Sequence, residues 1–374
     1  MKFVLFSHVR HRLVNGIVYA YGPYVREMNL WVGEKDHLVI VAPLHEDTSI
    51  DSIEISFHCK SIEFIRLPMF SLMGMNNFIK TLFLFPTITF QIFRGLFKPG
   101  HLHFRLPGNV GLIASILQVF FPKRQKSFKY AGNWDPKSHQ PWSYQLQKWI
   151  VTNSFLTQNA TVLVYGKSDS DPLHVTDFYT ATYSESDKID QLVIEDDLIP
   201  TFRFVFLGSL IEGKRPILAI QVIQSLHSKG IAAELLLCGD GPLKGHIQEY
   251  IEIHGLSSTV ILKGSMSREQ VDDILRNSHF LILPSKSEGW PKAVAEAMWW
   301  GCIPVSTPVS CVPHMLDYGN RGIIANPDVH EMSDAIIKVI NDRDFLKKIR
   351  LAAMQWSHQY TLERMKRDIS NMIR

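Results

Sequence analysis

The sequence has little of what would build a disulfide framework or cross a membrane. Only four of its 374 residues are cysteines, and no two of them form a CxxC pair; they are Cys59, Cys238, Cys302 and Cys311. Such scattered thiols fit a reducing compartment. The longest apolar run, residues 81–93, contains Pro86 and is shorter than the roughly 20 residues that a spanning helix needs. We therefore expect no transmembrane segment, and the short apolar run near the N-terminus predicts a strand rather than a signal peptide.

Acidic residues are scarce in one region. Between Lys60 and Ile150 the sequence has only Glu63 and Asp135 against many Lys and Arg, although the whole chain has a net charge of +3. The same region is rich in Phe and Met. A basic and apolar surface favours contact with an anionic membrane surface or a phosphate-bearing acceptor, and the alternative is an ordinary solvated face. No nucleic-acid-binding motif accompanies the charge, so we expect no nucleic acid partner.

Apolar runs alternate with helical periods along most of the chain. Hydrophobic residues make up 46% and charged residues 20%, as in a soluble globular protein of two or three domains. In the N-terminal half we expect strands at 2–7, 37–43, 62–68, 101–107, 126–130 and 160–166, and helices at 17–31, 75–97 with a break near Pro86, 108–121 and 142–155. Strands separated by helices predict a parallel, doubly wound α/β sheet.

The same rhythm starts again in the C-terminal half. We expect strands at 202–208, 233–239, 259–264, 280–283 and 322–325, and helices at 217–229, 243–254, 268–276, 330–341 and 344–359. Between the halves, residues 187–200 turn acidic and lose the pattern. The predicted domains are an N-terminal Rossmann-like domain at 1–186 that binds an acceptor, a linker at 187–200, a C-terminal Rossmann-like domain at 201–359 that binds a nucleotide-sugar, and a terminal helix at 360–374.

The segment from Phe280 to Val305 has the most chemical content. An apolar strand is followed by the polar loop SEGWP, a helix and a second apolar run, with Glu288 in the loop and Glu296 in the helix. Pro291 suits a first helical position, where backbone amides and the positive helix end can face an anion. The alternative is two solvated carboxylates on a surface loop and helix.

This segment resembles the C-terminal signature of the retaining, nucleotide-sugar-dependent glycosyltransferases of family 4. The resemblance implies the GT-B fold, in which two Rossmann-like domains with parallel sheets face each other across a cleft and a C-terminal helix crosses back to the N-terminal domain. It also implies that Glu288 lies beside the transferred sugar, with Gly289 and Trp290 in the same donor-binding loop, and that Glu296 binds the ribose hydroxyls.

A second segment, FLGSLIEGKRP, places Lys214 in a turn between a strand and a helix. A fixed cation there would stabilise the charge that builds on a departing diphosphate. The family usually has a Gly-Arg-Leu sequence followed by a Lys; here Gly208 and Lys214 match, and Ser209 occupies the Arg position. This departure puts one expected phosphate contact in doubt, and the alternative for Lys214 is an exposed loop lysine.

Two further strand ends carry glycines. The sequence CGDGP brings Gly239 and Gly241 after an apolar strand, where backbone can approach a ligand or turn tightly. It is not the GxGxxG of a nicotinamide-cofactor site, which counts against a dehydrogenase. Gly264 and Ser265 fall where the backbone of family members commonly contacts the nucleobase.

The N-terminal half gives weaker signals. The resemblance implies that Gly16 lies in a loop that closes over donor and acceptor, and that His103 contacts the donor sugar as a catalytic residue from a strand end; a lone strand histidine is more often simply packed. Arg105 could meet a phosphate of the acceptor. Asn133 and Asp135 would either face the acceptor or stabilise a turn.

Asp169 and Asp171 spell the DxD motif that binds metal in a different glycosyltransferase fold. Because GT-B enzymes stabilise the leaving group with cations and helix dipoles, we expect no metal and no cofactor.

The expected function is transfer of a sugar, with retention of configuration, from a nucleotide-sugar donor to a saccharide acceptor in cell-surface polysaccharide biosynthesis. The basic, apolar N-terminal half predicts a lipid-linked acceptor and a cytoplasmic protein that is peripheral at the inner face of a membrane. Two alternatives remain: a GT-B glycosyltransferase with a soluble small-molecule acceptor, and a sugar-nucleotide-binding protein without transfer activity.

Overall fold

The computed structural model describes residues 2–33, 36–45, 47, 49–51, 53–70, 75–136, 138–189 and 201–373, with the backbone alone for 75–80. The chain forms two compact units. The N-terminal unit consists of Met1–Thr180 and Arg364–Arg374, and the C-terminal unit of Ala181–Glu363. Most of the predicted linker, from residue 190 to residue 200, lies outside the described residues.

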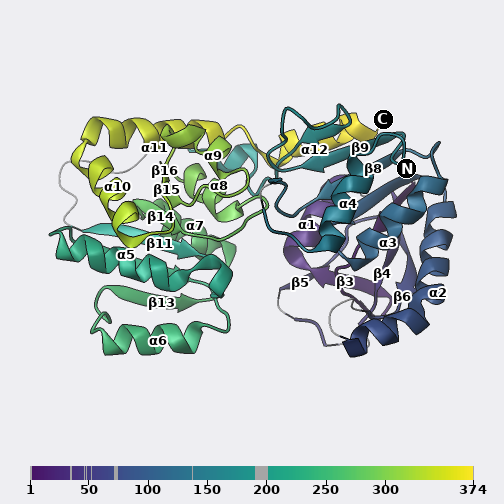
Figure 1. Cartoon of the computed structure of the whole chain (residues 1–374), viewed down its shortest axis with the longest axis horizontal. Coiled ribbons are helices and arrows are strands. Elements are labelled where there is room, and N and C mark those ends of the chain that lie inside the picture. Colours follow the sequence, from purple (N-terminus) through teal and green to yellow (C-terminus); the bar gives the residue numbers. More distant parts are fainter. Residues whose placement is uncertain are drawn as a thin grey trace. The chain divides into compact units, whose positions relative to one another are not determined.

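A parallel sheet of seven strands is the centre of the N-terminal unit (Figure 1). Its strand order is β10-β9-β8-β7-β1-β4-β6, and all neighbouring strands are parallel. The strands are β1 (Lys2–Phe6), β4 (His37–Pro43), β6 (Ser61–Leu67), β7 (His101–Leu106), β8 (Lys126–Tyr130), β9 (Ala160–Val164) and β10 (Val175–Asp177). The helices are α1 (Gly22–Trp31), α2 (Met75–Phe97), α3 (Asn109–Leu117) and α4 (Trp142–Thr152), with the short 3₁₀ turn η1 (Gln118–Phe120) after α3.

Alternate residues of each strand face opposite sides of this sheet. On one side, Phe6 of β1 and Phe104 of β7 join Ile88 and Ile92 of α2 in the main core. On the other side, residues of β7 and β8 contact α1, as the ring of His103 does with Trp31 at 4.2 Å between centroids. The side on which a strand residue lies therefore decides whether it meets the apolar core or the more polar layer under α1.

Two local expectations for this unit are wrong. Residues 17–21 are not helical but form β3 (Ile17–Tyr21), which pairs with β2 (His11–Val14) and β5 (Glu54–Ser56) in a small antiparallel sheet. The helix begins only at Gly22, with Pro23 in its first turn. Helix α2 also continues through Pro86 without a break, because buried residues on both sides of the proline hold it against the sheet.

The C-terminal unit contains a parallel sheet of six strands in the order β13-β12-β11-β14-β15-β16. The strands are β11 (Phe202–Leu207), β12 (Ala233–Cys238), β13 (Val260–Gly264), β14 (Phe280–Leu283), β15 (Ile303–Ser306) and β16 (Ile323–Ile324). The helices are α5 (Pro216–Ser228), α6 (Lys244–Ile253), α7 (Arg268–Arg276), α8 (Lys292–Trp299), α9 (Val312–Met315), α10 (Val329–Asn341) and α11 (Arg343–Ser357); the 3₁₀ turns are η2 (Glu185–Asp187), η3 (Glu212–Lys214) and η4 (Asp317–Gly319). The predicted α/β fold with two parallel sheets is confirmed.

The last helix, α12 (Leu362–Ile373), returns the chain to the N-terminal unit. Met365 and Ile369 on one face of α12 are buried. The hydroxyl of Tyr179 donates a hydrogen bond to Asp368 Oδ2 at 2.8 Å. Residues far apart in the sequence thus close the same domain.

Candidate functional site

Glycine turns follow three adjacent strands of the C-terminal sheet. Gly208 comes after β11, Gly239 after β12, and Gly264 ends β13, with φ angles of 151°, 152° and 70°. The amide of Gly208 donates to the carbonyl of Cys238 at 3.0 Å, and the amide of Gly239 to the carbonyl of Gly264 at 2.8 Å. A Cβ on Gly239 would lie 1.9 Å from the carbonyl oxygen of Gly208. Only glycine permits this contact, so the carboxyl ends of these strands present backbone, where parallel sheets bind ligands.

The segments that contain Gly208 and Gly241 form one surface. The amide of Leu210 donates to the carbonyl of Asp240 at 3.0 Å, and a Cβ on Gly241 would come within 2.6 Å of the Leu210 carbonyl oxygen. Ser209 and Ser265 are exposed on these turns. The two glycine motifs, separate in the sequence, are therefore parts of one structure.

Lys214 and Glu288 form an ion pair. Lys214 ends η3, and Glu288 lies in the loop between β14 and α8. The two loops are also joined by the backbone, because the amide of Lys286 donates to the carbonyl of Gly213 at 2.8 Å. The side chain of Glu288 is only 8% exposed and that of Lys214 24%. The structure thus brings together the cation and the carboxylate that the sequence assigned to diphosphate and sugar, with each neutralising the other.

The side chain of Arg215 is not fully available to bind a phosphate beside Lys214. Its backbone has a left-handed φ of 51°, and its guanidinium donates from Nη1 to the carbonyl of Pro284 at 3.0 Å. Arg215 therefore holds the start of the Glu288 loop, and this contact occupies part of the guanidinium that could have replaced the arginine absent at Ser209.

The loop residues Gly289 and Trp290 are held within the C-terminal unit. The carbonyl of Gly289 accepts a hydrogen bond from Ser310 Oγ at 3.2 Å. The Trp290 ring stacks on Trp356 with centroids 6.2 Å apart and meets the edge of Tyr360. Pro291 is the N-cap of α8 rather than its first residue. These contacts fix the loop at the start of α8. Because the Trp290 ring is packed against Trp356 and Tyr360, its role in donor binding would be to hold the loop in place rather than to contact the donor with its ring.

Glu296 lies in the middle of α8, where its Oε1 accepts a hydrogen bond from Thr182 Oγ1 at 2.9 Å. Burial raises the pKa of the Glu296 carboxyl above its usual value, and the Asp272 carboxylate adds to this effect. The hydrogen bond from Thr182 and the charges of Lys292 and Arg268 oppose the rise in pKa. Glu296 is therefore a half-buried carboxylate with acceptor capacity left for a ligand's hydroxyl groups.

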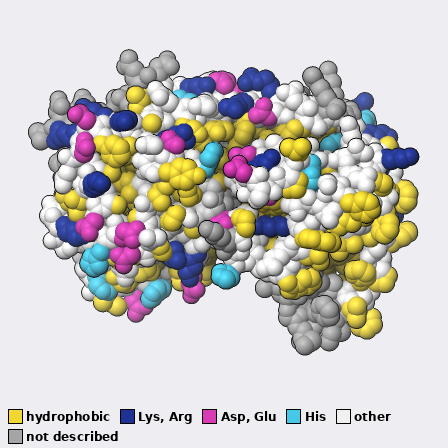
Figure 2. All heavy atoms as spheres, turned by 45° about the horizontal axis from the view of Figure 1, so that its top comes forward, with side chains coloured by type: hydrophobic (Ala, Val, Ile, Leu, Met, Phe, Trp, Pro, Cys, Tyr) yellow, Lys and Arg dark blue, Asp and Glu magenta, His cyan; other side chains and the backbone are white. Residues whose placement is uncertain are grey.

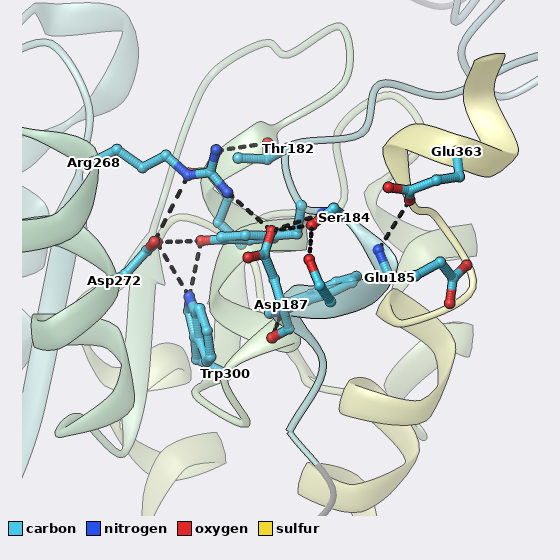
Figure 3. Close-up of polar contacts among 12 residues, drawn as sticks. Thr182, Ser184, Glu185, Asp187, Arg268, Asp272, Trp300 and Glu363 are labelled. Atoms are coloured by element: carbon cyan, nitrogen blue, oxygen red, sulfur yellow. Dashed lines mark hydrogen bonds and ion pairs between the residues drawn. The ribbon is translucent and has the colours of Figure 1, made fainter.

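A polar network fixes the segment that supplies Thr182 (Figure 3). The hydroxyl of the next residue, Tyr183, donates to Asp272 Oδ1 and accepts from Trp300 Nε1 at 2.8 Å. Arg268 pairs with Asp187 at 3.4 Å and lies over the Tyr183 ring. The residues come from η2 and its flanks, from α7 and from the end of α8. Sequence reasoning missed this group, because Thr182 and its neighbours carry no motif.

His103 does not occupy the place expected for it. It is the third residue of β7, not the last, and its ring is fully buried. Its Nδ1 shares a hydrogen bond with Ser127 Oγ at 2.8 Å, and the ring packs against Trp31 and Phe3. Burial lowers the pKa of His103 well below its usual value. The alternation of β7 places this histidine in the layer under α1, so the expected position at a strand end is wrong, and its contact with a donor sugar stays a prediction.

Arg105, two residues further on the same side of β7, is paired inside the N-terminal unit. Glu27 of α1 bonds both Arg105 and the buried Lys129 of β8, the latter at 2.8 Å. Burial lowers the pKa of Lys129, although Glu27 opposes this. The group carries two cations and one carboxylate, and the Arg105 side chain is 13% exposed. Its contact with an acceptor phosphate stays a prediction.

Asn133 and Asp135 form a turn. The Asn133 side chain accepts a hydrogen bond from the amide of Asp135 at 2.9 Å, as in an Asx turn. Asp171 accepts hydrogen bonds from Trp134 Nε1 and from the amide of Ser168. Within the described ranges, no three His, Cys, Asp or Glu side chains group as metal ligands. The acceptor roles of the turn and the absence of a metal stay predictions.

Gly16 follows Asn15 in the two-residue turn between β2 and β3, and both have positive φ. This geometry is that of a tight hairpin. A Cβ on Gly16 would meet no atom within 4 Å. The glycine is thus explained by the turn, and its predicted role over the donor and acceptor is untested.

The C-terminal unit is similar in sequence to known glycosyltransferases. Residues 198–356 match the family described as glycosyl transferases group 1. The chain is 24% identical over 146 residues to the alpha-D-kanosaminyltransferase of Streptomyces kanamyceticus, and 28% identical over 138 residues to the phosphatidylinositol N-acetylglucosaminyltransferase gpi3 subunit of Schizosaccharomyces pombe. These matches cover 39% and 37% of this chain, and 38% and 30% of those proteins. The chain thus matches well under half the length of these curated relatives.

Solved structures are similar over nearly the whole chain. Sucrose-phosphate synthase from Thermosynechococcus elongatus has a TM-score of 0.67 at 15% identity, covering 100% of this chain and 98% of that one. HepE from Anabaena, in complex with UDP and glucose, has a TM-score of 0.66 at 12% identity, covering 99% and 98%. The likeness shows that the chain, with its two α/β units, has the fold of the GT-B proteins.

Proposed function

We propose that this protein, whose C-terminal unit carries a group 1 glycosyltransferase domain, is a retaining glycosyltransferase of the family 4 type. It transfers a sugar from a nucleotide-sugar donor to a saccharide acceptor. The observation that supports this best is the pairing of Lys214 with Glu288 beside the backbone turns at Gly208 and Gly239. A cation and bare backbone at strand ends can bind a diphosphate, and a carboxylate beside them can accept hydrogen bonds from sugar hydroxyls.

In this proposal Lys214 leaves Glu288 when the donor binds and moves to the diphosphate. The bond between the anomeric carbon and the β-phosphate oxygen breaks, and the bond from that carbon to the acceptor oxygen forms on the same face. The leaving phosphate takes the proton of the acceptor hydroxyl. Lys214 stabilises the negative charge that grows on this phosphate, so its effect is larger in the transition state than in the ground state.

The two glutamates bind the sugars on either side of the diphosphate. Glu288, released from Lys214, accepts hydrogen bonds from the transferred sugar. Glu296 accepts those of the ribose, oriented by Thr182. The backbone at Gly264 and Ser265 contacts the base. No metal and no cofactor takes part in this proposal. Since the similar protein HepE forms a complex with UDP and glucose, UDP-sugars are the first donors to test.

The N-terminal unit would receive the acceptor. Arg105 is the cation of that unit that we assign to an acceptor phosphate, with the turn at Asn133 and Asp135 and the Gly16 hairpin as further contacts. We propose that the acceptor is lipid-linked, in cell-surface polysaccharide biosynthesis, and that the protein works at the cytoplasmic face of an anionic membrane. None of the helices in the described part of the chain has the length and apolar character to span a bilayer.

One screen and one assay test the proposal. Ligands that bind only the folded state raise its melting temperature, so a thermal-shift screen against UDP-, GDP- and ADP-sugars identifies the donor. Release of the nucleoside diphosphate, measured with and without acceptor, then separates an enzyme from a binding protein. Stabilisation by a donor with no release under any acceptor condition would favour the binding protein, and transfer to free sugars alone would favour a soluble acceptor.

A further inference from the structure

The outward face of α2 is apolar, although its inward face already supplies the core. Ile88, Ile92 and Leu96 of the inward face belong to the core of the N-terminal unit. On the opposite face, Phe83 is 80% exposed and Phe97 72%. A helix at the surface of a globular domain normally has a polar outer face. The outer face of α2 departs from this pattern.

The exposed phenylalanines follow a helical stripe. Phe83, Phe90 and Phe97 are spaced by seven residues, which places them on one side of the helix. The stripe continues onto the η1 turn, where Phe120 is exposed and lies 6.4 Å from Phe93 between ring centroids. Figure 2 shows hydrophobic side chains gathered on the side of the molecule where Figure 1 labels α2. We name this stripe, with Phe120, the phenylalanine face.

Basic residues flank the phenylalanine face. Arg94 and Lys123 are exposed, and Lys98 is paired with Glu63 at 2.6 Å. The sequence has no Asp or Glu at all between residues 64 and 134. The face is therefore apolar at its centre and positive at its margin.

Much of the basic charge counted in the sequence does not reach this margin. Lys126 is buried and donates from Nζ to Gln118 and to the carbonyl of Phe121, while Lys129 is paired with Glu27. The guanidinium of Arg124 donates to three backbone carbonyls at the end of α2 and just beyond it. Fewer basic side chains than the composition indicated are therefore available to meet an anionic surface.

We propose that the phenylalanine face docks on an anionic lipid bilayer, with α2 lying in the plane of the interface and its aromatic rings among the headgroups and upper acyl chains. Aromatic rings favour this depth, and basic side chains beside them meet anionic headgroups. A second copy of the chain fits less well. A symmetric dimer would place the same face on itself, so that the basic margins of the two copies would repel each other. This docking rests on the proposed function, in which the acceptor is lipid-linked. The phenylalanine face is the surface that brings the enzyme to the membrane that contains this acceptor.

Vesicle flotation tests the docking face. The intact protein should float with vesicles of phosphatidylcholine mixed with phosphatidylglycerol, and more weakly with phosphatidylcholine alone. F83Q/F90Q/F97Q keeps good helix formers on α2. Its affinity for the vesicles should be lower by about tenfold or more. R94Q/K123Q should lose about tenfold on the anionic vesicles and little on the neutral ones. Ile253→Gln, at an equally exposed position of α6, should bind as the unchanged protein does.

The controls keep this test independent of catalysis. Circular dichroism verifies that F83Q/F90Q/F97Q is folded, and its release of nucleotide from a donor in solution should equal that of the unchanged protein. Equal flotation of this variant and the unchanged protein would overturn the proposal. So would the absence of vesicle binding by the unchanged protein, or a dimer in sedimentation that F83Q/F90Q/F97Q dissolves without any lipid binding. If the unchanged protein turns over a donor but does not bind vesicles, the docking proposal fails and the proposed function stands. If it binds vesicles through the phenylalanine face but turns over no donor, the proposed function fails and the docking proposal stands.

Discussion

At the scale of single residues, the two cations of the candidate site already have partners within the protein when no ligand is bound. The ammonium of Lys214 has Glu288 as its counter-ion, and Arg215 is bound to a carbonyl. A diphosphate must therefore compete with Glu288 for the cation. Replacement of Glu288 and replacement of Lys214 should therefore change the affinity for the diphosphate in opposite directions.

Replacement of Glu288 by Gln should strengthen the binding of a nucleoside diphosphate by about fivefold, since loss of a competing carboxylate is worth roughly 1 kcal/mol. The same variant should lose sugar transfer, because the contact with the sugar is weakened. Lys214→Ala should weaken diphosphate binding and lower turnover by about 100-fold. Calorimetric titration and a nucleotide-release assay measure the two quantities.

Lys338→Ala, an exposed lysine of α10, is the matched control and should change neither quantity. If Glu288→Gln weakened the binding of the diphosphate as much as Lys214→Ala does, the two residues would not compete, and the roles given to them here would be wrong.

Glu296 predicts the pH dependence of donor binding. Its pKa is raised, so the carboxylate that accepts ribose hydroxyls is lost at a higher pH than for an ordinary glutamate. Donor affinity should therefore fall as the pH drops through this raised pKa. Thr182→Val removes a hydrogen bond that favours the carboxylate and should move the fall to still higher pH, while Thr182→Ser should restore it. Donor affinity measured across acidic pH tests this.

The same shift has a consequence for stability. Because the folded state binds a proton that the unfolded state has already released, the free energy of unfolding decreases as the pH rises from the usual glutamate pKa through the raised one. Glu296→Gln removes this cost. Its melting temperature at neutral pH should be higher than that of the unchanged protein even though donor binding is weaker, and a lower melting temperature would contradict the raised pKa of Glu296.

At the scale of elements, the glycine turns hold three strand ends together. Gly239→Ala would place a Cβ against the Gly208 carbonyl at a φ of 152°, so we expect a loss of about 2–4 kcal/mol in the free energy of unfolding. Gly245→Ala, in helix α6 with no atom near the new Cβ, should instead stabilise by about 0.5–1 kcal/mol. Urea denaturation of both variants gives the comparison, and equal effects would show that the turns do not depend on the close approach.

Most strands and helices could be predicted from the sequence, because both sheets are parallel and covered by helices, which leaves unbroken apolar runs separated by helical periods. The Glu288 loop and Lys214 could also be found, since each carries a local motif. The burial of His103 could not be predicted, because it depends on how α1 packs on that side of β7. Thr182 and the Glu27 group could not be found, since their contacts join residues far apart in the chain that no local pattern relates.

At the scale of the whole molecule, the chain leaves the N-terminal unit after Thr180 and returns to it at Arg364. Ile369 of α12 is buried there, and Asp368 bonds Tyr179. Ile369→Ala should reduce the stability of the N-terminal unit by about 2–4 kcal/mol. Lys366→Ala, exposed on the same helix, should have little effect. Thermal unfolding of the two variants compares them, and equal melting temperatures would mean that α12 does not contribute to the core of that unit.

The proposed function requires that the C-terminal unit hold one nucleoside diphosphate-sugar at the ends of β11, β12, β13 and β14. Calorimetric titration of UDP, GDP and ADP into the intact chain measures this binding. We predict that one of the three binds with one molecule per chain, and that the corresponding nucleoside without phosphates binds at least about tenfold more weakly, because it cannot reach Lys214. Binding of none of them at roughly millimolar concentration, or equal binding of nucleoside and diphosphate, would contradict the proposed function.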